Sequence, residues 1–536
     1  VLEISYIGYA SQEVKVADNK SLSIVMTEDT KVLNEVVVTA LGIKRETKSL
    51  TYNVQQIGGD EVAKAKDMNV MSSLAGKVAG VNINASSSGI GGGARVVMRG
   101  TKSISGNNNA LYVVDGVPLA NISSEQPDDQ YTGAGQSGDG LANFNADDIE
   151  SISVLSGSAA AALYGSAAAN GVVLITTKKG AVDKTRLTYS NNSTFYSPFR
   201  LSEFQNTYGS ETGEWYSWAS KLSSPTDYEV KDFFQTGYNV ANTVSLTTGT
   251  QKNQTYVSVG AVNARGIIQN NDLDRYNFSV RNTTSMLNDK LTMDLSFMYS
   301  NVKEQNMLSQ GEYANPLVPV YLFPRGDDFS KYQYYERYDV DRNIKTQFWP
   351  LKENGLSMQN PYWIAYRNVR TNEKKRYMLN AGLTYDILDW LNVSARIRVD
   401  NTDNTYQQKL YASTISTLTE GSTQGHYTIQ KVNETQTYAD FMVNINKRID
   451  DFTVVVNAGT SLSDNSSDLL GYGGPIRDTG VPNVFNVFDL DNAKKRATQE
   501  GWEEMTQSIF ASAEIGWKSM LYLTLTGRND WASQLK

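Results

Sequence analysis

VVMRGTKSISGNNNALYVVDGVP, residues 96–118, joins two short apolar runs through a polar segment that is rich in Gly and Asn. Gly and Asn tolerate positive φ angles, so a cluster of them between β-branched residues is typical of tight turns. The stretch therefore predicts an alternating strand, a turn-rich segment over residues 105–109, and a second strand over residues 111–114 that ends at Asp115 and Gly116. Taken alone, this pattern indicates a β-hairpin.

Two further blocks flank this stretch. LAGKVAGV, residues 74–81, precedes it, and DIESISVLSGSAAAALYGSAAANGVVLITTKKG, residues 148–180, follows it. Apolar spacing after Asn69 predicts a short amphipathic helix, and the Ala-rich residues 158–169 predict a second helix before a buried strand over residues 172–177. In this order the three blocks resemble the plug domain of the SusC-like TonB-dependent transporters of the outer membrane, the SusC/RagA family.

The residues at both ends of the turn-rich segment are the candidates for the plug core: Arg99, Gly100, Asp115 and Gly116. Arg99 is suited to pair with a carboxylate on the plug or on a barrel wall, and breaking a buried pair of this kind costs about 3–5 kcal/mol. A network of such pairs would hold the plug shut until it is pulled. The alternative is that Arg99 and Asp115 only satisfy backbone groups of the turns.

The composition excludes several kinds of site. The 536 residues carry a formal net charge of −8, with Lys and Arg mixed among Asp and Glu, which argues against a nucleic-acid surface. Without cysteine there is neither a disulfide nor a thiolate metal site. The single histidine, His426, excludes multi-histidine metal sites, and its polar surroundings are typical of a solvated loop. The long uncharged run 151–177 is mostly Ala, Ser and Gly, so we do not predict a membrane helix there.

The first 30 residues alternate with period two. They resemble the end of the carboxypeptidase-regulatory-like β-sandwich that precedes many plugs of this family, and the alternative is an edge hairpin of the next domain. No secretory signal opens the chain, so Val1 is not expected to be the natural start.

Residues 31–48 contain a β-prone run followed by a charged stretch. An extended segment of this kind can be added as an edge strand to the sheet of a partner. The residues alone favour an ordinary buried strand, but the position before the plug favours a handle, and the segment resembles the TonB box. The resemblance implies that TonB, with its inner-membrane motor proteins, pulls on this segment through Glu35, Val36, Val37, Val38, Thr39 and Ala40.

Residues 49–182 are assigned to the plug, and residues 183–536 contain long strands in which apolar and polar residues alternate. Strands of about a dozen residues match a tilted membrane crossing. Short turns and long polar loops alternate between them, which is the hallmark of outer-membrane barrels. The expected strands lie near 184–197, 239–250, 254–265, 274–287, 290–303, 375–388, 390–403, 435–449, 451–463, 504–517 and 520–530.

About eleven strands are too few to close a wide barrel, and an open sheet would expose two long edges. The barrel of the family has twenty-two strands, and residues 527–531, GRNDW, resemble a mid-barrel motif. We therefore expect a mostly β chain: about half of a transmembrane antiparallel β-barrel, an N-terminal α+β plug, and the end of a small β-sandwich.

The expected loop between residues 301 and 374 is rich in aromatic residues, which stack on sugar rings and hold peptides. The candidate ligand contacts are Tyr334, Tyr335, Trp349 and Trp363, although these side chains would equally pack the loop against its neighbours or a lid protein. The resemblance implies a SusD-like surface lipoprotein as a partner, and it leaves room for a dimer of transporter–lipoprotein pairs.

The sequence thus favours TonB-dependent import of oligosaccharides or oligopeptides across the outer membrane. The nearest alternative is a TonB-dependent siderophore or vitamin receptor, and a passive barrel would need no handle. A secreted glycan-active enzyme is less favoured, because adjacent carboxylates such as Asp147 and Asp148 point to opposite faces of a strand. We expect no catalytic residue, no cofactor and no metal site, although acidic loop residues such as Asp489 and Asp491 would suit calcium.

Overall fold

The computed structural model describes residues 54–534, except residues 65, 87–88, 104–107, 120–137, 156–163, 184, 226–227, 310, 352–357 and 519. Before residue 54 it describes only the backbone of four short strands, which form two antiparallel pairs. These strands are β1 (Leu2–Tyr6), β2 (Tyr9–Val14), β3 (Val36–Val38) and β4 (Lys44–Glu46).

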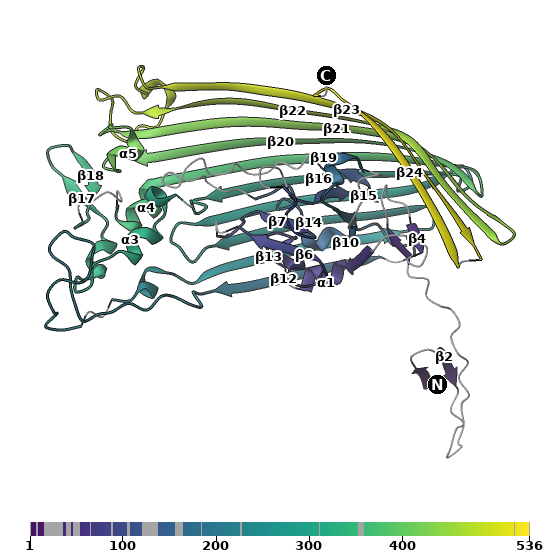
Figure 1. Cartoon of the computed structure of the whole chain (residues 1–536), viewed down its shortest axis with the longest axis horizontal. Helices are drawn as coiled ribbons and strands as arrows, with labels where there is room; N and C mark the ends of the chain where they lie inside the picture. The colour runs from purple at the N-terminus through teal and green to yellow at the C-terminus, as the bar shows by residue number, and fades with distance from the viewer. Residues whose placement is uncertain are drawn as a thin grey trace, which may run out of the picture.

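An antiparallel sheet of eleven strands forms a curved wall, with β12 and β24 at its two edges (Figure 1). Short turns join the strands at one end of this barrel wall, and the long connections with their small helices lie at the other end. The strands are β12 (Arg186–Tyr196), β13 (Gly237–Gly249), β14 (Asn253–Arg265), β15 (Asp272–Met286), β16 (Leu291–Gln305), β19 (Asn368–Leu388), β20 (Leu391–Tyr411), β21 (Gly425–Ile449), β22 (Phe452–Pro475), β23 (Arg496–Trp517) and β24 (Leu521–Ala532).

A small domain, the plug, lies against the concave face of the wall. Its central sheet has the order β5-β10-β11-β8-β9, in which β11 runs parallel to β8 and the other pairs are antiparallel. These strands are β5 (Val54–Gly58), β10 (Ile149–Leu155), β11 (Val172–Thr177), β8 (Leu111–Val114) and β9 (Val117–Pro118). A separate hairpin consists of β6 (Val81–Ala85) and β7 (Ala94–Met98), and α1 (Gly59–Lys64) follows β5. In the described part of the chain, no helix is both long and apolar enough to cross a membrane.

Apolar residues of the plug strands form its core and also contact the wall. Val113 and Ile152 are fully buried, as expected for the β-branched runs that predicted these strands. Met298 and Met378 of the wall belong to the same apolar cluster as the plug core, and Met442 belongs to a second cluster with Val113. The plug therefore packs against the wall through apolar side chains as well as polar ones.

The outer face of the wall changes character along the strands. In β20, the outward residues run from Leu391 to Val399 as Leu, Val, Ala, Ile and Val, and then continue from Asn401 to Thr405 as Asn, Asp and Thr. Five alternate residues span about ten positions, which is the length of a tilted membrane crossing. The half of β20 next to the short turns therefore matches the lipid, and the other half extends beyond it.

The plug differs from the sequence prediction in two elements. Residues 96–98 and 111–114 do not pair with each other, because β7 pairs with β6 while β8 pairs with β9 and β11. After Asn69, whose side chain accepts a hydrogen bond from the backbone N–H of Met71, the chain forms only the 3₁₀ turn η3 (Ser72–Leu74) instead of an α-helix. The first half of the second expected helix, residues 158–163, lies outside the described residues; of its described part, Tyr164 is helical and Ser166–Ala168 form the 3₁₀ turn η5. Apolar residues at helical spacing are buried here by irregular backbone.

Candidate functional site

A two-residue turn joins β8 to β9 and projects toward the wall. Asp115 and Gly116 both have positive φ, 50° and 83°, and Val114 pairs with Val117 across the turn. Two positive φ angles in succession are typical of the type I′ hairpin turn, which Asp-Gly favours. We call residues 114–117 the Asp115 turn.

The Asp115 carboxylate joins the plug to the wall. Its Oδ1 lies 2.9 Å from Nη1 of Arg281 on β15, and the two side chains are 13% and 10% exposed. The carboxylate also accepts hydrogen bonds from the backbone N–H and the hydroxyl of Thr177 on β11. Arg281 in turn binds both oxygens of Asp294 on β16. The plug carboxylate is therefore part of a buried network that joins the Asp115 turn and β11 of the plug to two wall strands, β15 and β16.

Two more arginines hold the backbone of the same turn. Arg398 donates hydrogen bonds to the carbonyl oxygens of Val114, at 2.5 Å, and Val117, at 3.1 Å. Arg396 donates to the carbonyl oxygen of Asp115, at 3.4 Å. We call Arg281, Arg396 and Arg398 the arginine clamp. A guanidinium presents several donors in a fixed plane, so the clamp fixes both the position and the orientation of the turn.

A second region of contact surrounds the 3₁₀ turn η4 (Ala146–Asp148). Asp148 accepts hydrogen bonds from the hydroxyls of Tyr256, Ser258 and Ser279 on β14 and β15, at 2.6–2.9 Å. Burial raises the pKa of Asp148 above its ordinary value, and these hydroxyls offset that effect only in part. The neighbouring Asp147 forms a buried ion pair with Lys66, at 2.6 Å.

Further wall side chains donate to plug carbonyl oxygens. Arg275 donates to Met68, Asn277 to Asn143, and Arg376 to Gly140. Within the wall, Arg376 pairs with Asp400 and Arg396 pairs with Asp440. The plug is thus held along its length by inward side chains of the wall.

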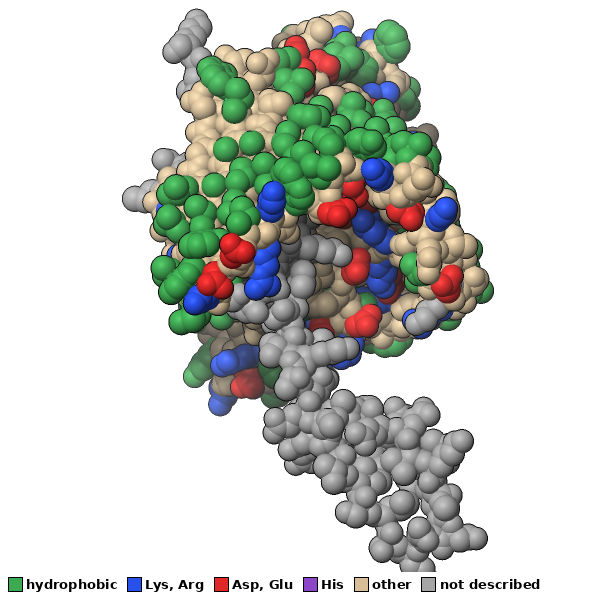
Figure 2. Space-filling view, turned by 90° about the vertical axis from the view of Figure 1, so that its right-hand side faces the viewer, with side chains coloured by type: hydrophobic (Ala, Val, Ile, Leu, Met, Phe, Trp, Pro, Cys, Tyr) green, Lys and Arg blue, Asp and Glu red, His purple; other side chains and the backbone are tan. Residues whose placement is uncertain are grey.

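A cavity of about 790 Å³ lies between the plug sheet and the short-turn end of the wall. Figure 2 views this end, where hydrophobic side chains cover the outer face and charged side chains gather around a hollow. Asp115, Arg281 and Arg396 line the cavity together with Glu150 of β10 and Ser394 of β20. The Asp115 turn therefore borders this open space.

The four candidate plug-core residues divide into two pairs. Asp115 and Gly116 form the turn held by the clamp, and Asp115 both pairs with a wall arginine and binds plug backbone. Arg99 and Gly100 form a left-handed turn after β7, with φ of 56° and 84°, and the side chain of Arg99 is exposed. The structure does not bring these two pairs into one cluster.

Of the predicted TonB-coupling residues, Val36, Val37 and Val38 form β3, which pairs with residues 44–46. Glu35, Thr39 and Ala40 lie outside the described residues, as do the side chains of β3. The coupling role of the segment stays a prediction.

The predicted loop aromatics fall into two environments. Trp363, in α4 (Pro361–Arg367), is 1% exposed, and its Nε1 donates to the hydroxyl of Thr414. Tyr335 stacks on Tyr366, and Trp349 packs in an aromatic cluster with Phe323. Tyr334, by contrast, is 82% exposed. Trp363 is thus a core residue of the loop, whereas Tyr334 presents its ring to solvent.

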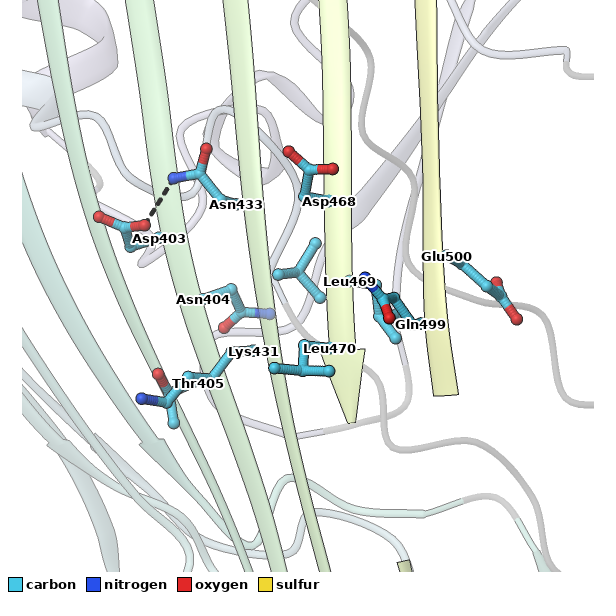
Figure 3. Close-up of a pocket in the computed structure, with 11 residues that line it drawn as sticks. Asp403, Asn404, Thr405, Lys431, Asn433, Asp468, Leu469, Leu470, Gln499 and Glu500 are labelled. Carbon is cyan, nitrogen blue, oxygen red and sulfur yellow. Dashed lines mark hydrogen bonds between the residues drawn. The ribbon is translucent and has the colours of Figure 1, made fainter. Parts of the chain in front are cut away.

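A groove of about 560 Å³ crosses β20–β23 in the part of the wall beyond the apolar band. Asp403, Asn433 and Asp468 form one row across the strands, and Asp403 accepts a hydrogen bond from Asn433 (Figure 3). These residues alternate with Arg396 and Arg398, which contact the plug, so the row faces outward. The groove is separate from the contacts of the plug.

The described residues contain no group of three or more His, Cys, Asp or Glu side chains placed to hold a metal. Asp489 pairs with Arg477, and Asp491 accepts a backbone hydrogen bond from Ala493. His426 is buried at the start of β21 and contacts Glu420, instead of lying in a solvated loop as expected.

Sequence reasoning missed the arginine clamp. The signal was present, because Arg396 and Arg398 alternate with Ala395 and Ile397 in a strand whose outward face is apolar. Charged residues on the inward side of a membrane strand must face either water or a partner inside the barrel.

Comparison with known proteins identifies the family. Residues 46–172 match the model of the TonB-dependent Receptor Plug Domain. Over 376 residues the chain is 30% identical to the TonB-dependent receptor SusC of Bacteroides thetaiotaomicron, which covers 67% of this chain and 36% of SusC. The chain belongs to the SusC-like TonB-dependent receptors. These receptors are outer-membrane β-barrel proteins, so the wall of this SusC-like chain lies in the outer membrane with its short turns toward the periplasm.

Two other proteins extend the comparison. The SusC-like chain is 25% identical over 552 residues to the TonB-dependent receptor P26 of Formosa agariphila, which covers 99% of the chain and 52% of P26. The RagAB peptide importer in its open-open state has a TM-score of 0.69 at 18% identity, over 93% of this chain and 56% of the other. The latter match shows a shared fold. The SusC-like chain spans about half the length, or less, of SusC and P26, both of which are named as TonB-dependent receptors.

Proposed function

We propose that the full-length protein imports oligosaccharides or oligopeptides across the outer membrane with energy supplied through TonB. The observation that carries this proposal is the clamped Asp115 turn. A plug that fills the barrel and is held by buried ion pairs must move before a large solute can pass, and each such pair costs about 3–5 kcal/mol to break. Force applied to residues 35–40 would supply that energy.

The substrate class rests on two supports. RagAB, whose fold the chain shares, is a peptide importer. In addition, the long-connection end carries aromatic side chains, whose faces stack on sugars and peptides. We assign ligand contact to Tyr334 first, with Tyr335, Trp349 and Trp363 as members of the loop that positions it. A SusD-like surface lipoprotein would cap this end, and two such pairs would form a dimer.

The test is uptake by cells that express the full-length protein with or without its TonB segment. Residues 35–40 are replaced by a Gly-Ser segment of equal length, and the matched control replaces residues 41–43 in the same way. Fluorescent oligosaccharides, fluorescent oligopeptides and a ferric siderophore are offered separately. Uptake of a sugar or peptide that is lost only with residues 35–40 is the expected result.

Other outcomes reject the proposal. Uptake of the ferric siderophore alone would assign the protein to the siderophore receptors. Sugar or peptide uptake that persists without residues 35–40 would indicate a passive barrel. Hydrolysis of the offered oligosaccharide by the purified protein would indicate an enzyme.

A further inference from the structure

The cavity under the plug is lined by balanced charges. Its basic side chains are Lys179, Arg281 and Arg396, and its acidic side chains are Asp115, Glu150 and Asp294. Much of the remaining lining is small or polar, including Ser151, Thr292, Thr384, Asn392, Ser394 and Asn444. Such a lining forms hydrogen bonds with a polar molecule but does not select a strong net charge. An oligosaccharide or a zwitterionic peptide matches this chemistry.

The cavity ends at the Asp115 turn. Asp115, Gly116 and Arg396 line it, whereas Arg398, the next inward residue of β20, does not. Arg398 is 0% exposed and binds the carbonyl oxygens on both sides of the turn. The turn and Arg398 therefore border the cavity on the side of the barrel interior.

Along β13 and β14, hydrogen bonds between buried side chains hold the plug against the wall. There, Asn145 donates to Thr243, and Asp148 binds Tyr256 and Ser258, with all of these side chains buried. These contacts are direct hydrogen bonds between packed side chains. The cavity is lined on the wall side by Gln254 of β14, Arg281 of β15 and Thr292 and Asp294 of β16, and it continues along the inner faces of β19, β20 and β21 at Thr384, Ser394 and Asn444.

We propose that this cavity is the exit half of the ligand path, and that displacement of the Asp115 turn from the arginine clamp opens it to the interior of the barrel. The inference rests on the proposed function, because it names the route that an imported polar ligand takes. The path then follows β20 and β21, while the contacts around Asn145 and Asp148 keep the plug attached to β13–β15, and Arg376 of β19 holds Gly140.

The experiment measures ion current through the full-length protein in planar bilayers, without TonB. Asp115→Ala removes the ion pair that ties the turn to Arg281, and it leaves Arg281 paired with Asp294, so no buried cation loses its last partner. Residues 1–536 contain no cysteine, so single cysteines report position once any cysteine elsewhere in the full-length protein is replaced by serine. Ser394→Cys probes the cavity, and Thr243→Cys probes the opposite contact.

In the Asp115→Ala background, we expect current that the parent protein lacks. The membrane-impermeant anionic thiol reagent MTSES should abolish most of this current at Ser394→Cys and little of it at Thr243→Cys. Arg398→Met serves as a second opening variant, because it removes two hydrogen bonds to the turn and keeps the Asp115–Arg281 pair. Heat-modifiable migration in gels confirms that each variant is folded.

Two results overturn the inference. Equal or stronger block at Thr243→Cys would place the path along β13 instead of β20. Absence of current in both folded opening variants would mean that the Asp115 turn does not close the path. Neither result depends on residues 35–40 or on uptake, so this inference and the proposed function fail separately.

Discussion

Asp115 and Arg281 are 166 positions apart in the sequence, and their charged atoms lie 2.9 Å apart. Asp115 belongs to a plug turn, and Arg281 belongs to a membrane strand. Because both side chains are nearly buried, their attraction is weakly screened by solvent, and loss of one partner leaves a charge that has lost its hydration. The pair therefore makes the stability of the plug depend on the barrel around it.

Arg281→Met should weaken the docking of the plug by about 3–5 kcal/mol, because it leaves the Asp115 carboxylate buried without its cation. Native-state hydrogen exchange at the Thr177 amide, which donates to Asp115, reports this change. Arg265→Ala is the control, since its pair with Asp272 is largely exposed and should contribute about 1 kcal/mol or less. Equal effects of the two substitutions would contradict the buried role of Arg281.

Adjacent glycines at the junction of β5 and α1 offer a matched pair. A Cβ on Gly59 would lie 2.0 Å from the carbonyl oxygen of Ile149, whereas a Cβ on Gly58 would meet nothing within 4 Å. Gly59→Ala should therefore destabilise the plug by about 1–3 kcal/mol or more, as overpacking does. Gly58→Ala should be nearly neutral. Protease digestion of the plug at increasing urea concentration measures both, and equal sensitivity would refute the packing argument.

Trp363 and Tyr334 should respond differently to truncation. Trp363→Ala removes a buried ring and its hydrogen bond to Thr414, which should destabilise the loop by about 3–5 kcal/mol. Tyr334→Ala removes an exposed ring and should leave loop stability unchanged while weakening ligand binding. Hydrogen exchange across α4 measures the first effect, and titration with an oligosaccharide or oligopeptide measures the second. Unchanged affinity for every ligand in Tyr334→Ala would remove this residue from the binding site.

The hairpin of β17 (Glu336–Asp339) and β18 (Ile344–Gln347) should loosen in acid. Burial alone would raise the pKa of Glu336, but hydrogen bonds from Lys345 and Arg367 outweigh it and lower that pKa. Because the pKa of Glu336 is lower in the folded state, its ionised carboxylate stabilises the hairpin fully at pH values above about 4.3, the ordinary pKa of Glu. This stabilisation is lost as the pH falls through the lowered pKa.

Hydrogen exchange of this hairpin, corrected for intrinsic rates, should therefore accelerate below about pH 4. Glu336→Gln should exchange faster at neutral pH and lack the acid step. Glu373→Gln, which changes a more exposed carboxylate, should keep the profile of the parent protein. An acid step that persists in Glu336→Gln would assign it to another group.

The sequence predicted the eleven wall strands because lipid on one side and water or plug on the other impose a strict alternation. It underestimated β21 and β22: β21 begins ten residues before the expected bound at 435, and β22 ends twelve residues after the expected bound at 463. Outside the lipid both faces of a strand meet water, so polar and apolar residues do not alternate there. Asn433 and Asp468 lie in this part of the strands.

The plug was predicted less completely. Residues 69–79 have the apolar spacing of a helix, but the plug buries them through turns whose shape depends on neighbouring strands. The arginine clamp was missed for a related reason. A partner such as Arg398, which lies 284 positions from Val114, becomes visible only when the barrel is wrapped around the plug.

The wall strands are long enough to extend well beyond the membrane. The 25 residues of β21 extend about 80 Å along the strand, or about 60 Å in height at a tilt of about 40°, while the hydrocarbon core is about 30 Å thick. Closed into a barrel, strands of this length would surround a deep well whose rim stands clear of the lipid surface. A molecule that dissociates at the bottom of such a well collides with its walls many times before it escapes, so recapture competes with loss by diffusion.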